Sequence, residues 1–132
     1  SKNNNIVEEI RDLTNGGVDY AIDLAGVIQA MDTAYQIVRY GGSVVTAGLS
    51  PINTQFSFNH SDLVAQEKSI LGSYMGSCVP VRDVPRFLNL YKQGRLPVDK
   101  LIDGKITFDN LNEGFDKLSK GEVVRQILMP NG

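Results

Sequence analysis

The sequence predicts an α/β fold built on a parallel sheet, and three observations carry this prediction. Helix-like and strand-like segments alternate through the first half, the connections between them are short, and residues 43–47 are mostly apolar and rich in β-branched side chains. That composition is typical of a strand buried on both faces. Helices alternating with such strands indicate parallel pairing through right-handed crossovers.

The first half is expected to contain two helices and two strands. Apolar residues at helical spacing begin the chain, and a Thr-Asn-Gly-Gly stop follows them. Gly41 and Gly42 are expected to end the second helix, because glycine readily takes left-handed backbone angles. Gly48 stands at the carboxyl end of the second strand, the edge where open α/β sheets bind ligands. The expected elements are a helix at 6–13, a strand at 18–24, a helix at about 28–39 and a strand at 43–47.

The second half changes its pattern after a loop at 50–54. Polar and apolar residues alternate at 55–58, which predicts a short strand with one exposed face. Asn59 or Ser61 is expected to cap the helix that follows, and Asp109 a later one. The other expected elements are a helix at 60–67, a strand at 69–75, a helix from about 80 to 93 with an apolar face, a broken strand at 101–108, a helix after 109 and a strand at 123–129.

Composition excludes several classes of protein. The chain has 132 residues, of which 42% are hydrophobic, and a formal net charge of −2. It is therefore expected to be globular, with no affinity for nucleic acid or for a membrane. One cysteine, Cys78, and one histidine, His60, are too few for a zinc site. The first residues carry no signal-peptide pattern, and they look like the start of a piece cut from a longer protein.

Ordered motifs cover nearly the whole chain. They are GGVD at 16–19, GGSVVTAG at 41–48, GSYMG at 72–76, VP at 84–85, LYKQGRL at 90–96, FDNLNEGF at 108–115 and GEVVR at 121–125. Together they resemble the carboxyl-terminal part of zinc-dependent, medium-chain alcohol dehydrogenases. The similarity is greatest to the branch of the glutathione-dependent formaldehyde and aryl-alcohol enzymes.

The resemblance implies a fold and a function. Residues 1–96 would be the second half of an NAD-binding Rossmann domain, and residues 97–132 a short α+β tail returning to the catalytic domain. The parent enzyme would transfer a hydride between NAD(H) and an alcohol or aldehyde, in the cytoplasm. NADP stays open as the cofactor, because the residue that reads the adenosine ribose lies outside the matched part.

The resemblance also implies cofactor-binding residues. Backbone groups of Ala47, Gly48 and Leu49 would face the nicotinamide ring; the alternative is that Gly48 only serves a tight turn. Ser73, Tyr74 and Met75 would border the same crevice, unless they only end a strand. Ala25 and Gly26 would flank the adenine, or simply turn the chain from strand to helix. Arg125 would reach the pyrophosphate, if the tail folds back over the cleft, or stay solvated.

Several residues are discounted as catalytic groups. His60 is expected at the surface or in a helix cap, and Cys78 has no base nearby in the sequence. Asp19 is expected at a strand end, and Asp23 as a buried, hydrogen-bonded group. We expect no metal and no catalytic residue in this chain. Zinc would be bound only by ligands elsewhere in the parent enzyme, and the isolated chain would be inactive.

The resemblance further implies a homodimer, formed through Phe56 and Phe58 and through the strand from Ser69 to Tyr74. Two other readings stay open. One is a non-catalytic α/β module that only assembles or binds a nucleotide, and the other is a zinc-free quinone reductase. Binding of reduced cofactor would argue against a pure assembly module.

Overall fold

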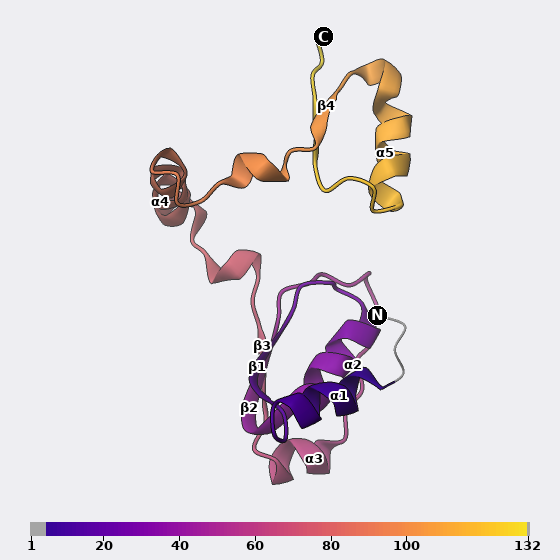
Figure 1. The fold of residues 1–132 in the computed structure, drawn as a ribbon, viewed down its shortest axis with the longest axis vertical. Helices are drawn as coiled ribbons and strands as arrows, with labels where there is room; N and C mark the ends of the chain where they lie inside the picture. Colours follow the sequence, from indigo (N-terminus) through magenta and orange to yellow (C-terminus); the bar gives the residue numbers. More distant parts are fainter. Residues whose placement is uncertain (1–4, 132) are drawn as a thin grey trace. The chain divides into compact units, whose positions relative to one another are not determined.

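The structure is a computed structural model, and it describes residues 5–131. The expected α/β fold with parallel sheets and helices is confirmed (Figure 1). The chain divides into two compact units, residues 1–78 and 79–132. Each unit is described by itself. The boundary at about residue 96, which the resemblance implies for the Rossmann part of a parent enzyme, stays a prediction.

The first unit contains one three-stranded parallel sheet in the order β1-β2-β3. Helix α2 connects β1 to β2, and α3 lies in the connection from β2 to β3 (Figure 1). Parallel strands joined through helices are what the alternating pattern predicts. The elements are α1 (Ile6–Leu13), β1 (Val18–Asp23), α2 (Ile28–Ile37), β2 (Val38–Thr46), α3 (His60–Ala65) and β3 (Ser69–Gly72).

The expected stop at Gly41 and Gly42 is wrong, because α2 already ends at Ile37 and both glycines lie inside β2. Pairing with β1 is interrupted here, since Val18 is opposite Val38 but Tyr20 is opposite Ser43. The extra residues of β2 form an irregularity in which Gly41 has a φ of +73°. A Cβ atom on Gly42 would lie 2.4 Å from Cγ1 of Val38, so close packing requires this glycine.

The core of the first unit lies between β1, β2 and α2. Its buried residues are Ala21, Met31, Ala34, Tyr35, Val38 and Val44. Phe56 and Phe58 do not form the expected strand, because residues 55–59 have no regular structure. Their rings instead lie 6.1 and 6.0 Å from the Tyr35 ring, between centroids. These aromatic residues therefore pack against the core rather than along a sheet edge.

The third strand is shorter than the sequence predicts. It ends at Gly72, and Met75–Ser77 form a 3₁₀ turn (η1) in which all three residues have positive φ. Such angles cannot continue a strand. The expected cap of α3 is confirmed at Asn59, whose side chain accepts a hydrogen bond of 2.9 Å from the Ser61 N–H.

The second unit contains a helix, a two-stranded parallel sheet and a second helix. Asp109 does not cap the second helix as expected. A 3₁₀ turn (η3, Phe108–Asn110) precedes that helix, and its cap position belongs to Asn110. The elements are α4 (Pro80–Lys92), η2 (Val98–Leu101), β4 (Gly104–Ile106), η3, α5 (Leu111–Ser119) and β5 (Gln126–Leu128).

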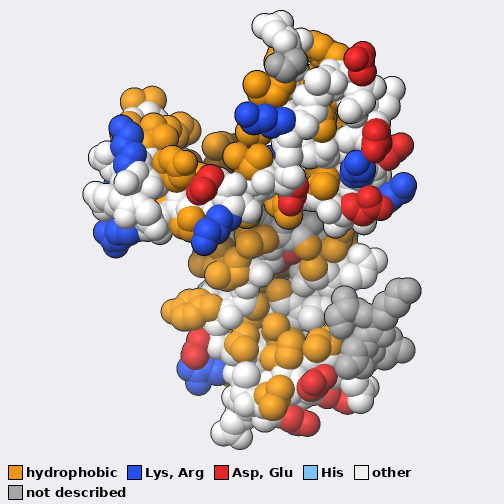
Figure 2. Space-filling view, turned by 45° about the horizontal axis from the view of Figure 1, so that its top comes forward, with side chains coloured by type: hydrophobic (Ala, Val, Ile, Leu, Met, Phe, Trp, Pro, Cys, Tyr) orange, Lys and Arg blue, Asp and Glu red, His pale blue; other side chains and the backbone are white. Residues whose placement is uncertain are grey.

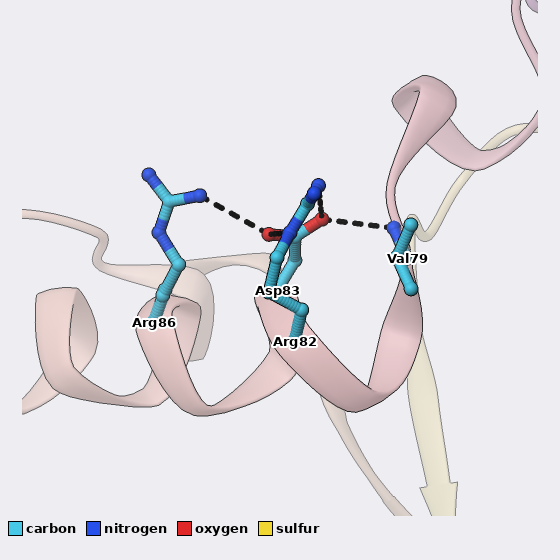
Figure 3. A network of polar contacts seen from close by, with 4 residues as sticks. All are labelled: Val79, Arg82, Asp83 and Arg86. Atoms are coloured by element: carbon cyan, nitrogen blue, oxygen red, sulfur yellow. Dashed lines mark hydrogen bonds and ion pairs between the residues drawn. The ribbon is translucent and has the colours of Figure 1, made fainter.

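A carboxylate network holds the first turn of α4 (Figure 3). Asp83 accepts the Val79 N–H at 2.8 Å and forms ion pairs with Arg82 at 2.7 Å and Arg86 at 3.1 Å. The Arg82 guanidinium first, and then the Val79 N–H, lower the pKa of Asp83 to about 2. This network satisfies a backbone donor at the helix start, where intrahelical partners are missing.

Large apolar side chains stay exposed in both units (Figure 2). The expected apolar face of α4 stays about half exposed among the described residues, since Leu88 is 53% exposed and Phe87 44%. None of the helices that the structure describes is long and apolar enough to cross a membrane.

Candidate functional site

A hollow of about 310 Å³ lies beyond the carboxyl ends of β2 and β3. Two of the segments singled out from the sequence meet there, one following each strand. Ligands of open α/β sheets bind at this edge. The hollow is lined by Thr46, Ala47, Gly48, Leu49, Gly72, Ser73 and Tyr74.

Asp23, the last residue of β1, fixes one wall of this hollow. Its side chain is buried, at 5% exposure, and accepts hydrogen bonds from Thr46 Oγ1 at 2.9 Å and the Ala25 N–H at 3.0 Å. Its backbone oxygen accepts the N–H groups of Ala47 at 2.8 Å and Gly48 at 3.2 Å. One residue therefore joins the exits of β1 and β2.

The opposite wall is connected to the first through the backbone. The Ser73 N–H donates to the backbone oxygen of Thr46 at 2.9 Å. The Ser73 hydroxyl lies 3.1 Å from that of Ser77, inside the turn that follows. The path after β3 is thus set by hydrogen bonds to β2 and within η1.

The absence of a side chain at Gly48 has a packing cause. A Cβ atom there would lie 2.1 Å from the backbone nitrogen of Gly26. In the reverse direction, a Cβ on Gly26, whose φ is +66°, would lie 2.6 Å from the oxygen of Leu49. The Ser50 hydroxyl adds a 2.8 Å hydrogen bond to the Gly26 oxygen. The two strand exits lie in direct contact.

Ala25 lines a different hollow of about 500 Å³, on the face formed by β1 and α2. That hollow also includes Ile22, Val27 and Ala30, so it is mostly apolar. Gly26 lies between the two hollows, through its contact with Leu49. The residues expected to flank an adenine and those expected to face a nicotinamide are therefore neighbours in the first unit.

Two predicted residues are not brought to the first hollow. Met75 begins η1, is 61% exposed and does not line it. Arg125 belongs to the second unit, where its N–H donates to the Asp103 carboxylate at 3.0 Å. The Val124 N–H donates to the same carboxylate, and these two donors lower the pKa of Asp103. The role of Arg125 at a cofactor stays a prediction.

Among residues 5–131, no group of three or more His, Cys, Asp or Glu side chains is placed to hold a metal ion. His60 is exposed at the first position of α3, where the sequence predicts a surface or cap residue. Cys78 is a half-buried free thiol. Asp23 is buried and hydrogen-bonded, as expected, whereas Asp19, the second residue of β1, is exposed and paired with Arg39.

Sequence reasoning identified Asp23 as a buried group but missed its role in joining two strand exits. The available signal was an acidic residue at the end of a strand, followed by Ala25 and Gly26. Short carboxylates in that position commonly accept backbone N–H groups two residues on. Thr46, its partner on β2, was missed because its residue type also fits an ordinary strand position.

The family model described as zinc-binding dehydrogenase matches residues 1–93. The chain belongs to the zinc-binding dehydrogenase family. It is 33% identical to alcohol dehydrogenase 1 of Cenchrus americanus over 127 residues, which are 96% of this chain and 33% of that protein. The chain therefore spans about a third of the length of the curated relatives it matches.

Solved structures of related dehydrogenases share the fold. Benzyl alcohol dehydrogenase from Acinetobacter calcoaceticus is 28% identical, with a TM-score of 0.83 over 96% of this chain and 35% of its own. A structure from Sinorhizobium meliloti 1021, determined with NADP bound, is 26% identical, with a TM-score of 0.70 over 89% of this chain and 33% of its own. This zinc-binding dehydrogenase chain shares its α/β fold with a part of such proteins that makes up about a third of their length.

Proposed function

We propose that this chain is part of an alcohol dehydrogenase that transfers a hydride between NAD(H) and an alcohol or aldehyde. The chain would supply the wall against which the nicotinamide lies. The observation that carries the proposal is the hollow at the carboxyl ends of β2 and β3, where the segments after both strands meet. When bound, the nicotinamide supplies the carbon that accepts or donates the hydride.

The residues of the hollow fit such a ring. The N–H groups of Ala47, Gly48 and Ser73 already donate to backbone oxygens. We therefore expect the carboxamide to bind through its N–H₂ group, which would donate to strand-end carbonyl oxygens, because these backbone N–H groups are not free to donate to the carboxamide oxygen. Leu49 and Tyr74 add apolar surface, since both line the hollow and both are more than two-thirds exposed. These residues bind and orient; none of them transfers a proton.

The same proposal assigns the remaining predicted residues. Ala25 and Gly26 would flank the adenine, Met75 would border the nicotinamide, and Arg125 would contact the pyrophosphate. Residues 1–96 would belong to the cofactor domain and 97–132 to a returning tail. The end of the family match at residue 93 supports this boundary. A structure with bound NADP in the same family supports a dinucleotide, NAD or NADP.

The side chains of this chain that could bind a metal do not fit a zinc site. A catalytic zinc site needs about three protein ligands, and the sequence has one cysteine and one histidine. We derive no step through zinc. In the proposed enzyme its ligands come from residues outside these 132.

A homodimer through the outer edge of β3 is part of the proposal. Within the described residues, β3 pairs with β2 only, so its other edge is open to a second chain. Phe56 and Phe58 are no longer assigned to that edge, because they pack on Tyr35. Leu71→Lys should shift the sedimenting species toward monomer, whereas Val81→Lys on α4 should not. An equal effect of both would contradict this interface.

The decisive experiment uses the enzyme that contains this chain and measures alcohol-dependent reduction of NAD and of NADP. Leu49→Trp, which fills the hollow, should raise the KM for the cofactor, while Ile52→Trp should not. Both side chains are exposed, but only Leu49 lines the hollow. No reduction of either cofactor would favour an assembly module, and equal KM values for the two variants would overturn the proposed wall.

A further inference from the structure

We propose that the first unit binds a small oxyanion in a second pocket, separate from the hollow beyond β2 and β3. This oxyanion pocket has a volume of about 210 Å³ and lies among α1, α2, α3 and the residue that precedes β3. Its polar lining consists of Arg11, Tyr35, Gln36, Asp62, Gln66 and Lys68. Three of these residues, Lys68, Tyr35 and Arg11, carry hydrogen-bond donors for which the described structure gives no matching acceptor.

Lys68 is the first such donor. Its side chain is buried, with the residue 9% exposed, and its ammonium lies 4.7 Å from the centroid of the Tyr35 ring. One N–H donates to the backbone oxygen of Tyr35 at 3.0 Å. Within residues 5–131, no carboxylate forms an ion pair with it. Lysine is rarely buried without a counter-ion, and an ammonium has three donors.

The Tyr35 hydroxyl is the second. Tyr35 is 8% exposed, and its hydroxyl is a buried polar atom without a hydrogen-bond partner in the described structure. Phe56 and Phe58 pack against the ring and limit its movement. Leaving a buried hydroxyl without a hydrogen bond costs free energy. A group that accepts a hydrogen bond from it would therefore bind more favourably.

Arg11 is the third. One of its terminal nitrogens donates to the backbone oxygen of Gln36 at 3.0 Å, and a guanidinium carries five N–H donors in all. Burial, and next the charge of Arg11, lower the pKa of Lys68, so the two cations face the same space. Asp62, the one carboxylate in the lining, is exposed. Its charge raises the pKa of Lys68 and so opposes the effects of burial and of Arg11.

Arg11 and Lys68 place two cations around one cavity, and Tyr35, whose buried hydroxyl has no partner in the described structure, is also among its lining residues. This lining favours an occupant that only accepts hydrogen bonds. A phosphate or carboxylate group has that chemistry and fits the volume. The oxyanion pocket is independent of the proposed dehydrogenase function. Lys68 precedes the four-residue strand β3, and Ser73 follows it. The two sites therefore lie roughly 16 Å apart along the strand, since five residue steps of about 3.3 Å separate Lys68 from Ser73.

The test is an NMR titration of the ¹⁵N-labelled 132-residue chain at constant ionic strength. One arm adds inorganic phosphate and the other adds acetate, which tells a phosphate group from a carboxylate. We expect saturable shifts of the amides around Lys68 and Gln36, with dissociation constants of about 1 mM or below in at least one arm. Lys68→Met and Arg11→Gln should each weaken binding about tenfold or more, because each removes a charge-assisted hydrogen bond.

Two further variants sharpen the result. Asp62→Asn should tighten binding by about two- to fivefold, since it removes an exposed like charge from the rim. Lys105→Gln on β4, in the second unit, should change nothing. The proposal is overturned if neither ion gives saturable shifts, or if Lys68→Met binds as the unaltered chain does. Should Lys68→Met not fold, unchanged affinity in the exposed Asp62→Asn variant overturns it instead.

Discussion

A Cβ atom on Gly48 would lie 2.1 Å from the backbone nitrogen of Gly26, so the exits of β1 and β2 are in backbone-to-backbone contact. The contact spans 22 positions of the chain and involves no side chain on either residue, as the numbering shows. It places the segment after β2, which forms one wall of the first hollow, against the segment after β1. The predictions below begin from this contact.

Gly48→Ala should destabilise the first unit by about 3 kcal/mol, because no flexible atom can move away from the added methyl. Urea unfolding of the chain measures this. Gly72→Ala is the matched control, since Gly72 lines the same hollow and a Cβ there would meet nothing within 4 Å. The control should be neutral or stabilising by up to about 1 kcal/mol. Equal losses in both variants would contradict the contact.

Asp23→Ala should cost about 2–3 kcal/mol, because it leaves the Ala25 N–H and the Thr46 hydroxyl without their acceptor. Thr46→Val removes only one of these two bonds and should cost less. A double-mutant cycle between the two positions should give a coupling energy of about 1 kcal/mol in chemical unfolding. Strict additivity would mean that Asp23 does not act through Thr46.

The pKa of Asp83, lowered to about 2, predicts a pH dependence for the start of α4. A carboxylate whose folded pKa is depressed stabilises the fold above its ordinary value of 3.8, and that stabilisation is lost as pH falls through about 2. A ¹³C titration of the side-chain carboxyl should therefore show a midpoint near 2. Circular dichroism should show α4 unaffected between neutral pH and about pH 4.

Two variants separate the causes of that pKa. Arg82→Gln should raise it more than Arg86→Gln, because the hydrogen bond from Arg82 has the larger effect. A larger rise in Arg86→Gln would contradict the geometry shown in Figure 3. Asp83→Asn should remove the carboxyl titration altogether and leave the Val79 N–H with a weaker acceptor.

Phe56→Ala should destabilise the first unit by about 2–3 kcal/mol, since the ring is partly buried against the core. Phe58→Ala should cost less, because Phe58 is 43% exposed. Thermal unfolding at low protein concentration measures both changes. If these rings instead formed a subunit contact, the loss of stability would depend on protein concentration. No loss of stability in dilute solution would therefore contradict their packing on Tyr35.

Expectations from the sequence are confirmed where the local residue pattern and the packing favour the same structure. The bounds of α1 and the buried state of Asp23 follow from spacing and residue type, and the cap of α3 is Asn59, one of the two candidates that the sequence offers. The expectation about Gly41 and Gly42 is wrong because close packing on Val38, and not helix termination, explains the second glycine. A contact between segments far apart in sequence leaves no local pattern.

The same reason explains the other differences. Residues 55–58 have the period of a strand, but within residues 5–131 no strand pairs with them, and the rings of Phe56 and Phe58 pack against Tyr35 instead. In the candidate site, the two segments after β2 and β3 could be predicted from parallel pairing, which brings strand ends to one edge. The approach of Gly26 to Gly48 could not, because it depends on how two loops turn after leaving the sheet.

The order β1-β2-β3 has a consequence for how this unit forms. Strands that are neighbours in the sheet are also consecutive in the chain, so every pairing joins segments separated by a single helix-containing connection. The entropic cost of closing such a connection rises only slowly with its length, so each pairing can form in turn as its connection closes. A nascent chain emerging residue by residue can therefore add β3 to an existing β1–β2 pair, with no need to wait for residues beyond Cys78.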